Sequence, residues 1–437
     1  MDTKQKVKFH TLGCKLNFSE SSTISKIFTD NNFELIEDKS QIADVIVINT
    51  CSVTSLAEKK SRQTISKLIK ENPKAFVAAI GCYSELKPEE LKNIEGVDLV
   101  LGSNEKFKIL EYINNLQNDK TPTCDYTKAD EFYSSYSLQG RTRTFLKIQD
   151  GCDYFCSYCT IPFARGRSRN ASVSDIISQI NEIVNTGSKE IILTGVNIGD
   201  FGKSTHETFT DLVKAIEKLD GINRFRISSI EPNLITDEII DIISTSNKFL
   251  PSFHIPLQSG SDTILKKMNR RYNRDVFKNR LEKIKSCMPH AFIGTDLILG
   301  FPGETDELFQ ETYDFIRDLK LSFIHVFQYS EREKAKASTF SEVVPNTKRY
   351  NRSKEIQKLA DKKLRQFYSE NLGKTASVLF ENQHSKGNLY GFTENYIKVE
   401  AKYDKRLVNK IVNVKLCELS QNGNVLITFD DLKPFNH

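Results

Sequence analysis

The chain has 437 residues, which is too long for one ordinary core, so we expect two or three domains. Its first ten residues are charged and lack the apolar core of a signal peptide, and no apolar run approaches the roughly 20 residues that cross a bilayer. We therefore expect a cytoplasmic protein with no membrane partner. Nine cysteines, an odd number in a reducing compartment, argue against a disulfide framework and favour metal binding or redox chemistry.

The net charge of +5 is small but unevenly placed. Residues 266–285 contain nine basic and two acidic side chains, and residues 348–365 contain eight basic and two acidic ones. Such runs are most often the solvated faces of helices. Basic surface on an otherwise acidic chain also suits a polyanionic partner such as RNA, so both interpretations stay open.

Three short apolar segments near the amino terminus each end at a cysteine. KVKFHTLGC, ADVIVINTC and AFVAAIGC end at Cys14, Cys51 and Cys82, and helical patterns separate them. The intervals of 37 and 31 residues match βαβ units. Because the carboxyl ends of parallel strands meet at one edge of a sheet, we expect the three thiols to share a metal centre. The alternative is that each cysteine is a small buried core residue.

The segment from about residue 120 to 140 lacks periodicity and is predicted to be a linker. It contains Cys124, which has no thiol at ligand spacing. Cys287 at a predicted helix end and Cys417 in a strand pattern are equally isolated. None of these three cysteines is predicted to be a ligand.

A second series of strands and helices follows the linker. Six segments, from TFLKIQDGC to FIHVFQYSERE, have the pattern of a strand that runs into a polar or glycine-bearing loop, and helical patterns separate them. Six such units predict a partial parallel barrel that is open on one side. Polar residues gather at the carboxyl ends of its strands, which is the face where barrel enzymes keep their active sites.

The first barrel strand leads into DGCDYFCSYCTIPFARG, which contains Cys152, Cys156 and Cys159. A structural zinc site needs four ligands, but this loop offers three, and no histidine or fourth cysteine follows nearby. A [4Fe–4S] cluster normally takes four thiolates, so three would leave one iron open to an outside ligand. The spacing therefore favours a cluster that does chemistry.

The CxxxCxxC motif, with Tyr158 just before its last cysteine, resembles the radical S-adenosylmethionine superfamily. The resemblance implies that the open iron chelates the amino and carboxylate groups of S-adenosylmethionine. It also implies that the reduced cluster splits this cofactor into methionine and a 5′-deoxyadenosyl radical. The partial barrel agrees with the fold of that superfamily, and the protein is expected to be an enzyme.

Nearly the whole chain resembles the methylthiotransferases of this superfamily. The resemblance implies an α/β protein with an amino-terminal parallel α/β domain (1–120), a partial (β/α)6 radical barrel (138–370) and a small carboxyl-terminal β-barrel (371–434). It further implies that the three amino-terminal cysteines hold a second [4Fe–4S] cluster. The stretches TGVNIG, SSIEP and HIPLQSGSDTILKKMNRRY are family-like. The resemblance implies that their residues line the cofactor pocket together with the motif tyrosine, namely Gly195, Asn197, Glu231, Gln258 and Tyr158.

The carboxyl-terminal segments TASVLFE, LYGFTENYIKVEA, KIVNVKLCEL and NVLITFD alternate in polarity and are divided by turns, which predicts a barrel of about five strands. It resembles the TRAM domain, an OB-like module that binds RNA. Phe392, Tyr396 and Tyr403 could stack on bases, although aromatic residues at such spacing are more often core. A purely stabilising appendage is the alternative.

Members of this family modify either an adenosine beside the tRNA anticodon or an aspartate of a ribosomal protein. TLGCKLN and LKIQDGCDYFCSYCTIPFARGRSRN most resemble the subgroup that acts on threonylcarbamoyladenosine, whereas the isopentenyladenosine subgroup usually has glutamine where Lys15 stands. The implied activity is insertion of a methylthio group at C2 of threonylcarbamoyladenosine at position 37, in the anticodon loop of tRNA. One S-adenosylmethionine would donate the methyl group and a second would be cleaved.

The sequence does not indicate the sulfur donor or the electron donor. The alternatives are action on isopentenyladenosine, action on the ribosomal aspartate, and a zinc-dependent RNA-binding protein without catalysis.

Overall fold

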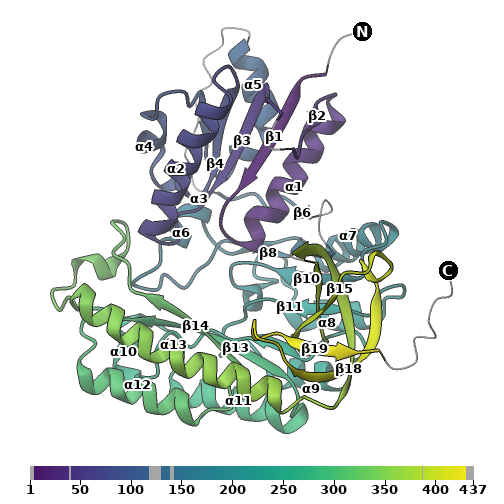
Figure 1. Ribbon diagram of the computed structural model, residues 1–437. Helices are drawn as coiled ribbons and strands as arrows, with labels where there is room; N and C mark the ends of the chain where they lie inside the picture. Colours follow the sequence, from purple (N-terminus) through teal and green to yellow (C-terminus); the bar gives the residue numbers. More distant parts are fainter. Residues whose placement is uncertain (1–3, 39–40, 118–128, 138–141, 386, 430–437) are drawn as a thin grey trace.

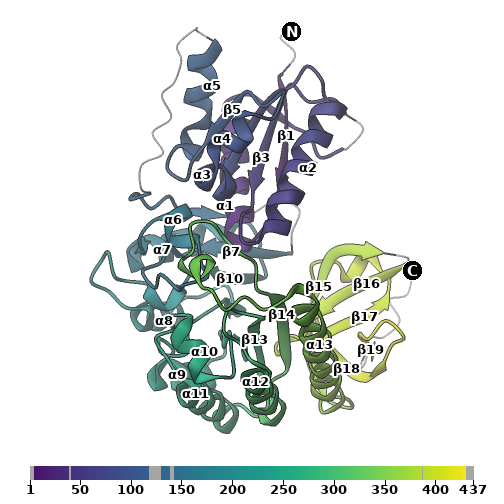
Figure 2. The ribbon, with the colours of Figure 1, turned by 90° about the vertical axis from the view of Figure 1, so that its left-hand side faces the viewer.

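The chain folds into three parts in a computed structural model (Figures 1 and 2). An amino-terminal sheet layered between helices lies above a partial barrel, and a small closed β-barrel lies beside the latter. The structure describes residues 4–38, 41–117, 129–137, 142–385 and 387–429. Cys124, most of the predicted linker and residues 430–434 lie outside these ranges. Within them, no helix is long and apolar enough to cross a membrane.

The amino-terminal part is a parallel sheet of five strands in the order β2-β1-β3-β4-β5. Its strands are β1 (Lys6–Thr11), β2 (Glu34–Leu35), β3 (Val45–Thr50), β4 (Phe76–Gly81) and β5 (Leu99–Leu101). The helices are α1 (Lys15–Asp30), α2 (Ser55–Glu71), α3 (Cys82–Leu86), α4 (Pro88–Lys92) and α5 (Ile109–Gln117), with the 3-10 turn η1 (Glu105–Lys108). Helices α1 and α5 cover one face of the sheet, and α2, α3 and α4 cover the other. Strand β3 is buried throughout, as expected for a β-branched run covered on both faces.

The middle part contains the six predicted parallel strands. These are β7 (Arg143–Lys147), β10 (Glu190–Thr194), β11 (Phe225–Ile227), β12 (Ser252–His254), β13 (Phe292–Leu299) and β14 (Phe323–Gln328). They form two sheets that isolated parallel bridges join between β11 and β12. No pairing among the described strands connects β14 to β7, so the barrel is open, and the predicted fold is confirmed. The predicted linker also contributes a short strand, β6 (Ser135–Tyr136), antiparallel to β7.

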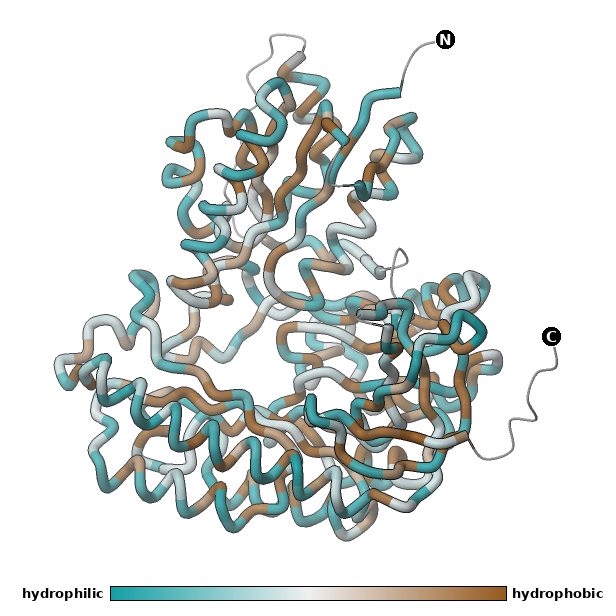
Figure 3. The backbone as a smooth tube through the Cα atoms, in the orientation of Figure 1, coloured by the Kyte–Doolittle hydropathy of each residue, from teal (hydrophilic) through white to brown (hydrophobic). Residues whose placement is uncertain are grey.

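Side-chain caps explain where the outer helices of the barrel begin. Ser172 and Thr208 each form a capping box with an aspartate three residues later, and Thr236, Asn273 and Thr305 each accept a hydrogen bond from a backbone N–H in the first turn. The helices that follow are α7 (Val173–Asn185), α8 (Phe209–Glu217), α9 (Asp237–Thr245), α11 (Arg274–Cys287) and α12 (Asp306–Asp318). The remaining elements are α6 (Ile161–Arg165), α10 (Asp262–Lys267), α13 (Asn346–Ser369), β8 (Gln149–Asp150), β9 (Arg169–Asn170), η2 (Ile198–Asp200) and η3 (Lys336–Thr339). Hydrophobic residues follow the strands, and hydrophilic ones colour the outward sides of the helices (Figure 3).

The carboxyl-terminal part is a closed barrel in the order β15-β16-β17-β19-β18, so the predicted small barrel is confirmed. Its elements are β15 (Thr375–Ser385), β16 (Asn388–Phe392), β17 (Lys398–Lys402), η4 (Lys405–Leu407), β18 (Ile411–Leu419) and β19 (Val425–Thr428). Two buried arginines, Arg224 just before β11 and Arg226 within β11, hold the carboxyl-terminal barrel against the open barrel. Arg224 donates to the carbonyl oxygens of Ser377 and Phe392, and Arg226 donates to those of Thr393 and Glu394.

The two basic runs lie on α10, α11 and α13, and several of their charges face inward. Arg270 is buried in the barrel, and Arg349 and Arg352 pair with Glu331 and Glu304. Lys363 donates to the carbonyl oxygens of Arg317 and Leu319 at 2.9 and 2.6 Å. The RNA-contact interpretation therefore does not hold for these residues, because their charges are used to pack the helices.

A buried network of charged side chains joins the amino-terminal sheet to the barrel. Arg165 on α6 donates to Glu20 on α1 and to Asp150 on β8, each at 3.0 Å. Lys106 and Lys147 also pair with Glu20, at 2.8 and 3.3 Å, and all five residues are at most 3% exposed. Burial alone would raise the pKa of Asp150, but Arg165 and Lys147 outweigh it and hold that pKa well below its usual range. The carboxylates are therefore ionised and each has several partners.

Removing one member of this network should be costly, because the others would stay buried and unpaired. We expect Arg165→Met to lower the free energy of unfolding by about 3–5 kcal/mol. Arg317→Met on the exposed side of α12 is the matched control and should stay within about 0.5 kcal/mol of the parent. Urea unfolding of the metal-free protein followed by circular dichroism measures both. Equal midpoints for the two variants would show that the network is energetically neutral.

Candidate active site

The three amino-terminal cysteines lie together at the carboxyl edge of the first sheet. Cys14 caps α1, Cys51 follows β3, and Cys82 opens α3 directly after β4. The strands end in register, since Thr11 pairs with Asn49 and Thr50 pairs with Gly81. The predicted convergence of this triad is therefore explained by the parallel register, which brings three distant cysteines to one edge.

Two glycines and one asparagine shape the backbone around this triad. Gly13 has a φ of 99°, and a Cβ there would lie 2.9 Å from the Cys51 sulfur, so only glycine fits. Gly81 has a φ of 100°, and a Cβ there would lie 2.3 Å from Asn49 Oδ1. Asn17 Nδ2 donates to the carbonyl oxygens of Leu12 and Thr50 at 2.8 and 3.1 Å, which ties the first two cysteine loops together.

The environment of this triad suits a bound metal. Cys51 and Cys82 are buried and Cys14 is exposed. Burial and the neighbouring Cys82 raise the pKa of the Cys51 thiol to about 11, and burial also raises the pKa of Cys82, while Arg165 lowers both. Three neighbouring thiols, two of them buried, form a soft donor set, which iron and zinc prefer. A cation would replace the protons that the raised pKa values keep on Cys51 and Cys82.

The second triad occupies the loop between β8 and α6. Gly151 opens this loop with a φ of 69°, and a Cβ there would lie 1.9 Å from the Arg167 carbonyl oxygen. The Tyr154 N–H donates to the Cys152 sulfur, and the Ile161 N–H donates to the Cys159 sulfur at 3.5 Å. Burial and the mutual proximity of the thiols raise the pKa values of Cys152 and Cys159 to about 12. Backbone donors aimed at sulfur stabilise thiolates once a metal has removed the protons.

Arg270 connects Cys156, the middle cysteine of this triad, to the predicted cofactor pocket. Its Nη1 donates to the Cys156 sulfur at 3.0 Å and to the Tyr158 hydroxyl at 3.2 Å, and its Nη2 pairs with Glu231. The Tyr272 hydroxyl accepts from Nε at 3.1 Å. In the sequence, Arg270 stands in the basic run 266–285, and no role was predicted for it. The family-like stretch that contains it was the one signal that could have distinguished it from its neighbours.

Two of the predicted cofactor-pocket residues line a cavity beside the second triad. The cavity has a volume of about 210 Å³ and is bordered by Tyr158, Cys159, Gln258 and Asp296. Gln258 has a φ of 66°, which is rare for a residue with a side chain, and its Oε1 has no hydrogen-bond partner among the described residues. A buried oxygen without a partner, in a cavity that Cys159 also borders, points to a ligand that supplies one.

Gly195 and Asn197 lie at the end of β10 and are not among the residues that border this cavity. A Cβ on Gly195 would lie 2.8 Å from the Oε1 atom of Gln149, which accepts the N–H groups of Val196 and Asn197. Asn197 is 4% exposed, and neither its Nδ2 nor its Oδ1 has a partner within the described ranges. The unpaired amide fits a polar ligand, while the glycine is needed for packing.

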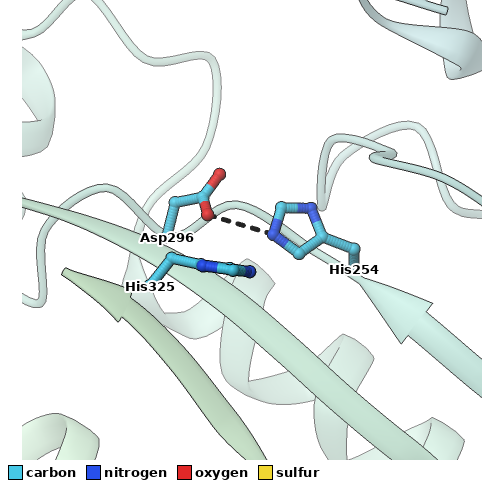
Figure 4. A group of neighbouring side chains, drawn as sticks. All are labelled: His254, Asp296 and His325. Atoms are coloured by element: carbon cyan, nitrogen blue, oxygen red, sulfur yellow. Dashed lines mark hydrogen bonds and ion pairs between the residues drawn. The ribbon is translucent and has the colours of Figure 1, made fainter. Parts of the chain in front are cut away.

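A group of side chains that the sequence analysis missed lies inside the barrel (Figure 4). His254 on β12 contacts Asp296 on β13 through Nε2 at 3.0 Å and Ser229 through Nδ1 at 3.1 Å. His325 on β14 lies beside them, and one ligand atom from each of the three residues lies within 4.8 Å of the others. His254 stands in the family-like stretch HIPLQSGSDTILKKMNRRY, which was the available signal for this group.

A second cavity of about 290 Å³ lies nearer the amino end of β13 than the first, since Gly294 borders it whereas Asp296 and Ile298 border the first. It is bordered by Lys15, His254, His325 and the predicted aromatic residues Phe392 and Tyr396. Its border therefore comes from all three parts of the chain. The third predicted aromatic residue, Tyr403, lies elsewhere on the carboxyl-terminal barrel, 4.4 Å from the His384 ring, and does not border this cavity.

Comparisons with known proteins agree with this geometry. A family model described as "Radical SAM superfamily" matches residues 146–316, and one described as "Uncharacterized protein family UPF0004" matches residues 6–102. The chain is 38% identical over 421 residues to the threonylcarbamoyladenosine tRNA methylthiotransferase MtaB of Bacillus subtilis (strain 168), covering 94% of this chain and 93% of that protein. It is 33% identical over 430 residues to the tRNA-2-methylthio-N(6)-dimethylallyladenosine synthase of Clostridium tetani (strain Massachusetts / E88), covering 95% of each.

Among solved structures, the chain is similar to TsrM from Kitasatospora setae, a radical S-adenosylmethionine methyltransferase with cobalamin and a [4Fe-4S] cluster bound. The TM-score is 0.56 at 14% identity, over 77% of both chains, which shows a shared fold. The two curated relatives carry the stronger conclusion, because their identity exceeds 30% across nearly the whole chain. The resemblance that the cysteine motifs predicted is confirmed, and this enzyme belongs to the radical S-adenosylmethionine methylthiotransferase family.

Proposed function

We propose that this enzyme inserts a methylthio group at C2 of threonylcarbamoyladenosine next to the anticodon of tRNA. The observation that carries the proposal is the presence of two thiol triads, one in each of two domains that a single buried charge network holds together. The 38% identity to the Bacillus subtilis enzyme supports threonylcarbamoyladenosine as the substrate. The 33% identity to the Clostridium tetani enzyme keeps the isopentenyl (dimethylallyl) substrate as the alternative.

Cys152, Cys156 and Cys159 are proposed to hold a [4Fe–4S] cluster, with S-adenosylmethionine at its open iron. When bound there, cluster and cofactor supply the radical chemistry that activates a C–H bond no side chain could deprotonate. Arg270 would hold Cys156 and Tyr158 in place by charge-assisted hydrogen bonds. Four further residues are assigned to the cofactor pocket, namely Gly195, Asn197, Glu231 and Gln258.

Cys14, Cys51 and Cys82 are proposed to hold a second [4Fe–4S] cluster for sulfur insertion. The charge around Arg165 supports this assignment. The buried network contains the anions Glu20 and Asp150 but four cations, because Arg169 also pairs with Asp150 at 3.3 Å. Arg165 interacts electrostatically with Cys82 and Cys14. A [4Fe–4S] cluster held by three thiolates would carry a net negative charge and would partly offset this surplus of buried cations.

The remaining assignments complete the proposal. The partner is the anticodon loop of tRNA, and the carboxyl-terminal barrel serves as a TRAM-type RNA-binding domain. The domain boundaries are 1–120, 138–370 and 371–434, and the location is the cytoplasm. The sulfur and electron donors are left unassigned.

The substrate assignment is tested in a strain that lacks this gene. Its tRNA should contain threonylcarbamoyladenosine without the methylthio group, and the 2-methylthio nucleoside should return when the gene is restored. Mass spectrometry of nucleosides from purified tRNA measures both. Loss of the methylthio group from isopentenyladenosine would instead support the alternative tRNA substrate, and unchanged tRNA would contradict both.

The assignment of the barrel triad predicts the metal content. Anaerobically reconstituted protein should carry close to eight irons and eight sulfides, since two clusters of four are proposed. Replacing Cys152, Cys156 and Cys159 with Ala should halve both values and abolish formation of 5′-deoxyadenosine. Cys287→Ala, an exposed cysteine outside the site, is the control and should change neither. Full iron retention in the triple variant would contradict the assignment of these three cysteines as ligands. A colourless protein that contains zinc in place of iron would contradict the assignment as a radical enzyme.

The amino-terminal triad predicts a different loss. With Cys14, Cys51 and Cys82 replaced by Ala, the protein should keep about half its iron and still cleave S-adenosylmethionine, because the barrel triad is intact. It should make no methylthiolated tRNA. Chromatographic assay of 5′-deoxyadenosine beside the modified nucleoside separates the two activities. Product at the parent level would show that these cysteines are core residues only.

A further inference from the structure

The cavity of about 290 Å³ has an apolar wall and, among the described residues, two bordering lysines without a carboxylate partner, Lys15 and Lys398. Aromatic rings of the carboxyl-terminal barrel and the radical barrel form the wall, including Phe292, Phe392 and Tyr396. Tyr396 has a φ of 64°, a backbone conformation that bulky residues rarely adopt, so the fold holds this ring in place against local strain. Lys15 of the amino-terminal domain borders the same cavity.

Of the other cations that border the cavity, Arg226 has a carboxylate partner, and Lys398 contacts an aromatic ring, with its ammonium 4.7 Å from the centroid of Tyr390. Arg226 is paired with Glu190 at 2.8 Å, and the nearby Arg143 is paired with Glu381 at 2.7 Å. Asp296 contacts His254, as described above. Within the described part of the chain, no carboxylate or other acceptor pairs with the ammonium of Lys15. Arg143 and Arg226 act on this ammonium as charges of the same sign, whereas Tyr396 and Cys14 act in the opposite sense. The cavity therefore presents two lysine ammonium groups, those of Lys15 and Lys398, to which the described residues supply no carboxylate partner.

This surplus of positive charge decides what the cavity can bind. His254, Asp296 and His325 have the donor atoms of a metal site, but the ammonium of Lys15 acts electrostatically on His325 and would repel a divalent cation. An anionic group, in contrast, would pair with the ammonium of Lys15 and compensate its charge. One residue pair also links this cavity to the proposed cluster site. Asp296 borders the cavity of about 210 Å³ beside Tyr158 and Cys159, and its hydrogen-bond partner His254 borders the cavity of about 290 Å³.

We infer that Lys15 is a specificity-determining residue whose ammonium binds the carboxylate of the threonylcarbamoyl group while the aromatic wall contacts the rest of the nucleoside. The inference rests on the proposed function and goes beyond it, because it assigns the choice of substrate to one side chain. A threonylcarbamoyl group carries a carboxylate that an isopentenyl group lacks. An uncharged isopentenyl group in this cavity would displace the water that hydrogen-bonds to the ammonium and would offer no acceptor in its place. The ammonium would then be desolvated without compensation, and this free-energy penalty disfavours the wrong substrate.

The test uses reconstituted full-length enzyme and anticodon stem-loop RNAs. One RNA carries threonylcarbamoyladenosine and the other carries its carboxamide analogue, which keeps the shape but removes the charge. Wild-type enzyme should prefer the acid by about 10- to 100-fold in kcat/KM, the usual strength of a hydrogen bond to a charged group. Lys15→Gln should lose this preference through a higher KM for the acid alone, with unchanged iron content and S-adenosylmethionine cleavage.

Two further variants control this experiment. Lys26→Gln removes an exposed lysine from the same helix and should keep the full preference for the acid. Lys15→Arg keeps the charge and should retain most of the preference, and Lys15→Met, which removes the charge, replaces Lys15→Gln if that variant loses iron. The inference is overturned if wild-type enzyme treats acid and amide equally, or if an iron-replete Lys15→Gln enzyme still prefers the acid. Wild-type activity on isopentenyladenosine RNA, with none on the acid, would instead reject the proposed function and the inference with it.

Discussion

The docking of the amino-terminal domain on the barrel depends on a charge network that is almost completely buried. Glu20 belongs to the amino-terminal sheet domain, Asp150 and Arg165 belong to the barrel, and their side chains meet at 3.0 Å. Transferring such groups from water costs several kcal/mol each, and only complete pairing offsets that cost. The network is therefore stable only when both domains are docked. Because Asn17 accepts from Arg165 at 2.7 Å and also fixes the Cys14 loop, docking and the geometry of the first triad are one event.

Parallel strand order then converts a docked pair of domains into a reaction site. Both sheets are parallel, so each presents its carboxyl edge, and each edge carries a cysteine triad. Alternate residues of β13 border the two cavities in turn. Gly294 borders the cavity of about 290 Å³, Ile298 borders the cavity of about 210 Å³, and Asp296 between them links the two through its hydrogen bond to His254. A nucleoside that extends across this boundary would meet the barrel triad at one end and Lys15 at the other.

The sequence predicted the parts of this structure that depend on local periodicity. Six barrel strands and both triads follow from short apolar segments that end in polar loops, because register in a parallel sheet is local and repetitive. Contacts between distant elements left no such pattern. Arg270, Arg349 and Lys363 belong to basic runs, and a run does not reveal which side chains turn inward. His254, Asp296 and His325 come from three different strands, so no spacing in the sequence brings them together. The charge network was missed for the same reason.

The central claim is that two metal clusters lie on the two sides of the Arg165 network. Crystals of the anaerobically reconstituted enzyme, measured above and below the iron absorption edge, test it most directly. The account predicts two iron peaks in the anomalous difference map, one among Cys14, Cys51 and Cys82 and the other among Cys152, Cys156 and Cys159. A single iron peak at the barrel triad, with three free thiols at the amino-terminal edge, would contradict it.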